Sequence, residues 1–246
     1  MTIETTATVG DLAAKLPQAT RVLEQFGIDY CCGGGQTLAE ACRFKAVDAQ
    51  EVVRAIEESL KREQVARNYA ELDQNELIDH IVSTHHAFTR SEIERLTALL
   101  NKVVSVHGVR HPELVDVQKT FIDLAEDLLP HLVKEETCLF PYISKVESFG
   151  PRKAVRPAAH FGTVQSPVRM MMFEHDLAGH LLRELRRITS EYAIPADACA
   201  SYKALYQAME KFEADLHQHI HLENNVLFPR AIQREAELMH QQRIAS

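Results

Sequence analysis

The sequence predicts an all-α protein, in which an antiparallel four-helix bundle follows a small helical N-terminal domain. Only nine glycines and nine prolines punctuate its 246 residues, so long helices can form with few interruptions. Apolar residues recur at three- and four-residue steps, which is the period of one helix face. A histidine–glutamate motif occurs twice in the second part of the chain. The repeat indicates two copies of one helical hairpin, and therefore a bundle with approximate twofold symmetry.

The N-terminal domain is predicted to cover residues 1–66. Its helix-start signals are capping boxes, in which an N-cap side chain and a glutamate three residues later bond reciprocally to the backbone. Thr37 with Glu40 fits this pattern, as does Asp48 with Glu51. With the apolar periodicity, these signals predict short helices at residues 9–26, 37–45 and 48–66. A linker near residues 67–74 should separate this domain from the bundle.

The bundle is predicted to cover residues 74–246. Asp73 with Glu76 forms a third capping box, and an apolar stripe begins at Leu77. Four long helices are expected, at residues 74–107, 112–149, 166–193 and 196–238. The connection at 148–166 is long and rich in glycine and proline, and loops of that length are usually functional or mobile. We expect this loop to open a route from the bundle interior to solvent.

Composition excludes several classes of function. The formal net charge is −8, and no basic stripe offsets the acidic residues, which argues against nucleic acid as a partner. No apolar run reaches the length of a membrane span, and the first residues lack a signal-peptide pattern. The five cysteines form no even framework, which is typical of a reducing compartment. We therefore expect a cytoplasmic protein that binds neither nucleic acid nor membrane.

The repeated motif indicates a metal site. His131 and Glu135 are followed by Phe140-Pro141, and His219 and Glu223 are followed at the same spacing by Phe228-Pro229. Residues at i and i+4 lie on one helix face, so each imidazole and carboxylate can converge on one point. Another histidine precedes each copy of the motif by nearly the same interval. For the second copy this histidine is His175, and for the first it lies on the first bundle helix. Four imidazoles and two carboxylates suit two first-row transition metals.

The pattern leaves open which histidine the first bundle helix contributes. His80, His85 and His86 all lie on it. A helical wheel places His85 nearer the middle of the apolar stripe, whereas the spacing to the following motif slightly favours His86.

Three acidic residues are candidates for orienting the ligands. Asp127 and Asp215 stand one turn before His131 and His219, where each could accept a ring N–H from its histidine. The alternative is a solvated acid on the helix edge. Glu174, directly before His175, is expected near the entrance of the site.

Cys31 and Cys32 form a second candidate site. They precede three glycines and the predicted helix start at Thr37. Because glycine adopts turns that other residues cannot, we expect both sulfurs to be exposed. The nearby helix N-terminus would favour a thiolate, the reactive form. The pair is thus expected to be redox-active or to transfer ligands. The alternatives are a buried structural pair and a metal-binding pair, for which further ligands are lacking.

The chain resembles a known family along nearly its whole length. Its bundle is similar to hemerythrin-like bundles, and the whole chain resembles the di-iron Repair of Iron Centers (RIC) proteins. The resemblance rests on Asp29-Tyr-Cys-Cys-Gly-Gly34, Asp79-His80-Ile81, Glu174-His175-Asp176 and the stretch Leu222–Pro229. It implies two iron ions, joined by an oxo or hydroxo bridge and by two bridging carboxylates, Glu135 and Glu223. It also implies terminal ligation by His86 in preference to His85, and by His131, His175 and His219.

The resemblance implies a function as well. The expected role is repair of iron–sulfur clusters damaged by nitrosative or oxidative stress, with the di-iron centre supplying iron or redox equivalents. The expected partners are damaged or apo iron–sulfur proteins and small ligands such as nitric oxide or oxygen, and a homodimer is compatible with it. The alternatives are a di-iron nitric oxide or peroxide reductase, and an oxygen or nitric oxide sensor. The cysteine-bearing domain argues against a plain oxygen carrier, which would need no redox cysteines.

Overall fold

The computed structural model describes residues 3–62, 68–149 and 161–245. This part of the chain is almost entirely helical, and its one pairing between extended residues is an isolated antiparallel bridge between Thr8 and Thr37. The all-α prediction is therefore confirmed. No helix in the described ranges is long and apolar enough to cross a membrane. The chain divides into two compact units, residues 1–79 with 141–168 and 217–246, and residues 80–140 with 169–216.

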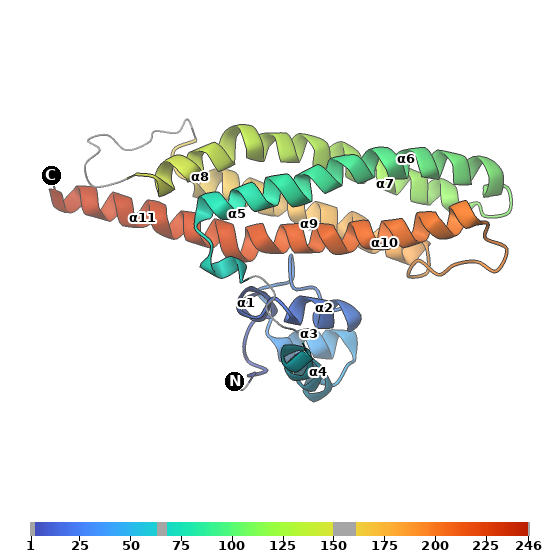
Figure 1. The fold of residues 1–246 in the computed structure, drawn as a ribbon, viewed down its shortest axis with the longest axis horizontal. Coiled ribbons are helices and arrows are strands. Elements are labelled where there is room, and N and C mark those ends of the chain that lie inside the picture. Colours follow the sequence, from blue (N-terminus) through green and yellow to red (C-terminus); the bar gives the residue numbers. More distant parts are fainter. Residues whose placement is uncertain (1–2, 63–67, 150–160, 246) are drawn as a thin grey trace. The chain divides into compact units, whose positions relative to one another are not determined.

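The first unit contains the N-terminal helical domain (Figure 1). One predicted helix at residues 9–26 is in fact two, because Pro17 cannot donate a backbone hydrogen bond within a continuous helix. The capping box of Thr37 with Glu40 is present. The helices pack around Leu23, Leu38 and Ile56, which are fully buried. Their bounds are α1 Val9–Lys15, α2 Ala19–Gln25, α3 Leu38–Lys45 and α4 Ala49–Arg62, followed by the short 3-10 turn η1 Tyr69–Glu71.

The same unit holds further helical segments from the bundle region. Gln74 donates to Glu147 at 2.6 Å, which links two of these helices. Glu235 is buried and accepts hydrogen bonds from the Tyr142 hydroxyl and from the Val164 N–H. The last contact ties the end of the predicted 148–166 loop to the C-terminal helix, while residues 150–160 of that loop lie outside the described residues. The segments are α5 Gln74–His80, α8 Phe140–Glu147, η4 Leu222–Leu227 and α11 Phe228–Ala245.

The second unit is a four-helix bundle. Its helices are α6 Ala87–His107, α7 Glu113–Lys134, and the greater parts of α9 Gln165–Ile188 and α10 Ala200–His221. The α6–α7 and α9–α10 turns lie at the same end, where His111 bonds to Asp197 at 3.0 Å, so consecutive helices run antiparallel. Phe121 and Phe212 meet edge to face in the core, with ring centroids 5.7 Å apart. We call the end of the bundle that carries the α6–α7 and α9–α10 turns the turn end.

In the described part of the chain, three π-helical segments interrupt helices that the sequence predicted to be continuous. They are η2 Ile81–His86, η3 Glu135–Leu139 and η4. The repeated Phe-Pro directly follows η3 and η4. Because proline has no N–H, a carbonyl in the preceding turn loses its usual donor, and the hydrogen-bond ladder there must be rearranged. Single π turns inside α-helices are rare and often mark functional sites.

Candidate metal centre

Four predicted ligands come together inside the second unit. His86 ends η2, His131 lies near the end of α7, Glu135 begins η3, and His175 lies within α9. All four are buried, and none is more than 2% exposed. Glu135 Oε2 lies 3.5 Å from His86 Nε2 and 3.4 Å from His131 Nε2. His131 Nε2 and His175 Nε2 are 3.0 Å apart. The centre of this cluster is therefore bounded by three imidazole nitrogens and one carboxylate.

The cluster fits a transition metal. Two nitrogens that bind one ion at about 2.1 Å and at right angles are about 3.0 Å from each other, which matches the His131–His175 separation. Both oxygens of Glu135 are buried, and no described group offers either of them a hydrogen bond. A buried carboxylate in that state is strongly unfavourable unless a cation compensates its charge. Ligand atoms of His131, Glu135 and His175 all lie within 4.8 Å of one another, so a single ion can reach all three.

A carboxylate holds the outer nitrogen of two of these imidazoles. His86 Nδ1 donates to Glu136 at 2.7 Å, and Arg90 donates to the same oxygen at 2.9 Å. An ionised carboxylate only accepts hydrogen bonds, so the proton sits on Nδ1 and the Nε2 lone pair faces the cluster. Although burial acts to raise the pKa of Glu136, the hydrogen bonds from Arg90 and His86 outweigh it and lower that pKa below its ordinary value.

Glu174 plays the same part for His131. It accepts a hydrogen bond from His131 Nδ1 at 2.8 Å, and its other oxygen pairs with Lys134. Burial again opposes ionisation, but Lys134 and His131 lower the pKa of Glu174 below its ordinary value. Each of the two histidines thus has its tautomer fixed by a carboxylate, which is fixed in turn by a cation.

The two predicted orienting aspartates lie elsewhere. Asp127 is exposed on α7, and the hydrogen bond to His131 that was expected from Asp127 is made by Glu174 instead. Asp215 pairs with His85 Nδ1 at 3.0 Å rather than orienting His219. His85 is buried, with its Nδ1 bound to Asp215 and its ring edge-on to His80. Of the competing histidines of the first bundle helix, His86 is the one beside Glu135. Glu136 was missed, because an immediate neighbour of a ligand normally points about 100° away around a helix.

The second copy of the motif lies in the first unit. His219 is on α10 and Glu223 is in η4. His219 Nε2 and Glu223 Oε1 are 2.9 Å apart, and the two side chains are 1% and 0% exposed. The i,i+4 pair therefore adopts the predicted convergence, with both ends buried.

The cysteine loop differs from what its sequence suggested. Cys31 is buried, and only Cys32 is half-exposed, so the expectation of two exposed sulfurs was wrong. The Cys31 thiol donates to Asp29 at 3.3 Å, and the two sulfurs are 3.9 Å apart. Hydrogen bonding with Cys32 and burial raise the pKa of the Cys31 thiol well above its ordinary value, and Asp29 adds to this. Cys31 is thus a protonated thiol, contrary to the predicted thiolate.

The loop is fixed to η4 by one amide side chain. Asn225 Nδ2 donates to the Tyr30 carbonyl at 3.1 Å and to His221 Nδ1 at 3.0 Å. Burial lowers the pKa of His221 to about 4, so its ring is neutral and can accept this bond. Gly34 matters here for space and not for its conformation, because a Cβ on it would lie 3.0 Å from Asn225 Oδ1. The expected glycine-specific turn is absent, since Gly33, Gly34 and Gly35 have no positive φ.

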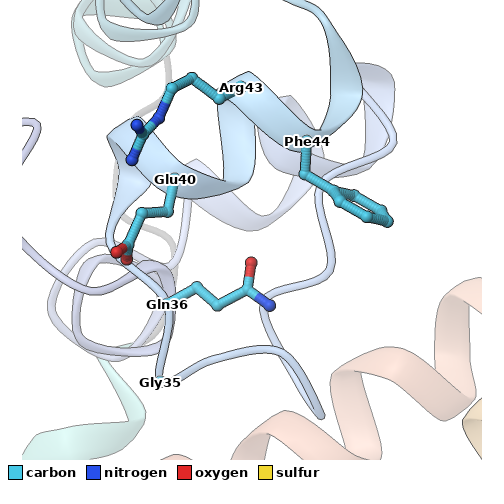
Figure 2. A pocket seen from close by; sticks show the side chains of 5 residues that line it. All are labelled: Gly35, Gln36, Glu40, Arg43 and Phe44. Atoms are coloured by element: carbon cyan, nitrogen blue, oxygen red, sulfur yellow. The ribbon is translucent and has the colours of Figure 1, made fainter.

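The N-terminal domain also carries an open surface hollow (Figure 2). Its lining comes from Glu40, Arg43 and Phe44 of α3 and from Gly35 and Gln36 in the turn before it. Phe44 is 83% exposed. None of the predicted ligands or cysteines lines this hollow, so it is separate from both candidate sites.

Comparison with known proteins matches two family models. The Hemerythrin HHE cation binding domain matches residues 77–231, and a domain of unknown function (DUF542) matches residues 5–60. The chain is 35% identical over 227 residues to the iron-sulfur cluster repair protein YtfE of Escherichia coli O157:H7, covering 92% of this chain and 97% of that protein. It is 31% identical over 220 residues to the iron-sulfur cluster repair protein ScdA of Staphylococcus haemolyticus, covering 89% and 95%.

Proposed function

We propose that this chain, which belongs to the hemerythrin HHE cation-binding family and, within it, to the iron–sulfur cluster repair proteins, repairs damaged iron–sulfur clusters. The damage would come from nitrosative or oxidative stress, and the repair would take place in the cytoplasm. The observation that carries the proposal is the buried group of His86, His131, Glu135 and His175. Its facing nitrogens, and a carboxylate that receives no hydrogen bond from the described residues, fit a metal. Its partners would be damaged or apo iron–sulfur proteins.

We propose that the cofactor is a pair of iron ions with an oxo or hydroxo bridge. Glu135 and Glu223 would bridge the ions, and His86, His131, His175 and His219 would bind them terminally. The identical spacing of the two motifs and the burial of all six side chains support this assignment. When bound, the iron pair would supply redox equivalents or iron to a client and leave room for a small ligand such as nitric oxide or oxygen.

The chain's own residues would prepare the site. Glu136 and Glu174 hold His86 and His131 with their Nε2 lone pairs turned inward. Arg90 and Lys134 keep those carboxylates ionised and in place. Apolar packing excludes water, as where Phe140 stacks on the His86 ring at 5.7 Å. Protein-held imidazoles need no rearrangement when a metal enters or leaves.

Cys31 and Cys32 would act with the metal centre as redox or transfer residues. We infer that Cys32, the more exposed sulfur, contacts the client or reductant, while Cys31 is the protonated second thiol held by Asp29. Asn225 fixes this loop to the same π-helical segment that carries Glu223. Replacing both cysteines by alanine should leave iron content unchanged and lower repair of a damaged cluster protein. Full repair by that variant would reduce the pair to a structural role.

A reductase or a gas sensor is the competing function. Metal analysis and repair assays on the purified protein separate these proposals. We expect about two irons per chain and restoration of activity to an iron–sulfur hydratase whose cluster nitric oxide has damaged. His86→Ala should lose iron and repair together, while the neighbouring His85→Ala should retain most of both. Rapid nitric oxide or peroxide turnover without cluster repair would favour the reductase, and a chain that holds zinc alone would refute the di-iron site.

We also infer a homodimer, which a set of exposed apolar side chains on the second unit supports. Its residues recur at three- and four-residue steps on α7 and on α9, the helices that carry His131 and His175. The set consists of Leu129, Val133, Met170, Phe173 and Leu177. Exposed apolar patches of this kind mark protein–protein contacts. Light scattering should give twice the chain mass for the wild type and the monomer mass for Phe173→Glu. The control is Val109→Glu, which changes an exposed apolar residue at the turn end; a monomeric wild type would refute the dimer.

A further inference from the structure

A cysteine–histidine pair lies at the turn end of the bundle, apart from the metal cluster. Cys199 directly precedes α10 and is exposed. His107, the last residue of α6, is 3% exposed, and its Nε2 lies 3.1 Å from the Cys199 sulfur. The other ring nitrogen of His107 is buried, and no described group gives it a hydrogen bond. Among the described residues, the Cys199 thiol is thus the one group that shares a hydrogen bond with the buried His107 imidazole.

Cys199 also sits at the start of a long helix. Its carbonyl accepts the hydrogen bond from the Lys203 N–H, as the N-cap residue of α10 does. Negative charge at this position is stabilised by the helix dipole and by the free N–H groups of the first turn. Reactive cysteines in proteins combine these features, namely partial exposure, a neighbouring histidine and a helix N-terminus.

A second exposed cysteine provides an internal comparison. Cys138 lies in η3 and is also exposed. Its recorded neighbour is the Thr137 hydroxyl at 3.7 Å, a group that is no base at neutral pH. Exposure alone would make the two cysteines react alike, so a difference between them reports the effect of His107 and the helix start.

We propose that Cys199 and His107 form a thiol–disulfide exchange site for small disulfides such as oxidised glutathione. As the Cys199 sulfur attacks one sulfur of the disulfide, its proton passes to His107 Nε2. The old S–S bond breaks, a mixed disulfide forms on Cys199, and the departing thiolate takes the proton back from His107. One disulfide is consumed, and one mixed disulfide and one thiol are produced. This site is independent of the repair function proposed above.

The surroundings of the pair are held in place by other contacts. The His107 ring packs against the Tyr202 and His111 rings, with centroids 5.4 and 6.3 Å away. The charged and titratable groups of the neighbouring turns are His111, Glu113, Asp197 and Arg110, which bond among themselves. His107 is therefore fixed by ring packing and remains directed at the sulfur.

The test is to incubate the full, metal-loaded chain with oxidised glutathione and to follow each cysteine by peptide mass spectrometry. We expect Cys199 to form the mixed disulfide at least about tenfold faster than Cys138. His107→Gln should bring the Cys199 rate down to about that of Cys138, with iron content and melting temperature close to wild type. Equal rates for the two cysteines in the wild type would overturn the proposal, and this comparison needs no variant. An unchanged Cys199 rate in a folded His107→Gln protein would overturn it equally.

Discussion

The two ends of the four-helix bundle in the second unit both hold buried histidines, but the groups around these histidines differ. At the metal end, two ring nitrogens face each other at 3.0 Å beside a carboxylate that receives no hydrogen bond from the described residues. At the turn end, His111 bonds to both Glu113 and Asp197, and His107 bonds to Cys199. The comparison teaches that burial and residue type do not identify a histidine as a metal ligand, whereas a neighbouring buried carboxylate that needs a cation does.

The largest effect on stability should come from removing the metal that the buried histidines and Glu135 would bind. A ligand that binds the folded state at a thousandfold excess over its Kd contributes about 4 kcal/mol, and 1 kcal/mol shifts the melting temperature of a chain of this size by about 2–4 °C. We therefore expect stripping of the metal, or His131→Ala, to lower Tm by about 10 °C in calorimetry. His107→Gln at the turn end should leave metal content unchanged; a similar Tm with and without metal would remove the distinction between the ends.

A second prediction is that one substitution in the metal cluster stabilises the metal-free protein. Glu135→Leu removes a buried carboxylate to which no described residue donates a hydrogen bond. Replacing buried charges by apolar groups is often stabilising by about 1–4 kcal/mol. The variant should therefore bind no metal and yet unfold at a higher denaturant concentration than the metal-free wild type. Chemical unfolding of both metal-free proteins gives the comparison. A less stable variant would show that Glu135 is satisfied within the protein itself.

A third prediction concerns the outer carboxylates. Removing a group that orients a metal-bound histidine typically lowers metal affinity about 10- to 100-fold. Glu136→Ala and Glu174→Ala should each weaken metal binding by this amount, as measured by competition with a chelator. Asp127→Ala, which removes an exposed acid from the same helix as His131, is the matched control and should retain wild-type affinity. Equal losses in all three would point to a general charge effect.

The smallest effect is expected at the turn end and depends on pH. Hydrogen bonding to Glu113, opposed by burial and reinforced by Asp197, raises the pKa of His111 above its ordinary value. A raised folded-state pKa stabilises the fold fully below the unfolded pKa, and this stabilisation is lost as the pH rises through the folded value. His111→Ala should lower Tm at pH 5.5 by about 2 °C, as for a surface ion pair, and by less at pH 9. A difference that grows with pH would contradict this assignment.

The sequence predicts the fold better than the detail of the site. Long apolar stripes and the capping boxes at Thr37 and Asp73 place the helix starts to within a few residues, because both signals are local. The helix ends are predicted less well, since the last helix runs to Ala245 and not to residue 238. The π-helical segments could not be foreseen, since one extra residue per segment barely alters a helical period. Glu136 was missed because its role depends on the rearranged turn of η3, and Asp215 was assigned to the wrong histidine because its partner is 130 residues away. The burial of Cys31 likewise depends on tertiary contacts that local sequence does not encode.

The Asn225 contact sets a limit on how this protein can be recombined. A Cβ on Gly10 would lie 2.6 Å from Asn225 Oδ1, and the Tyr30 ring rests edge-on against His221 at 5.3 Å. The surface of the N-terminal domain is therefore complementary in shape to one short stretch of α10 and η4. In chimeras, grafting residues 1–66 alone onto a foreign bundle should leave the domain unanchored. A graft that also carries residues 217–227 should seat it, and natural exchange of the domain between chains would have to move both pieces together.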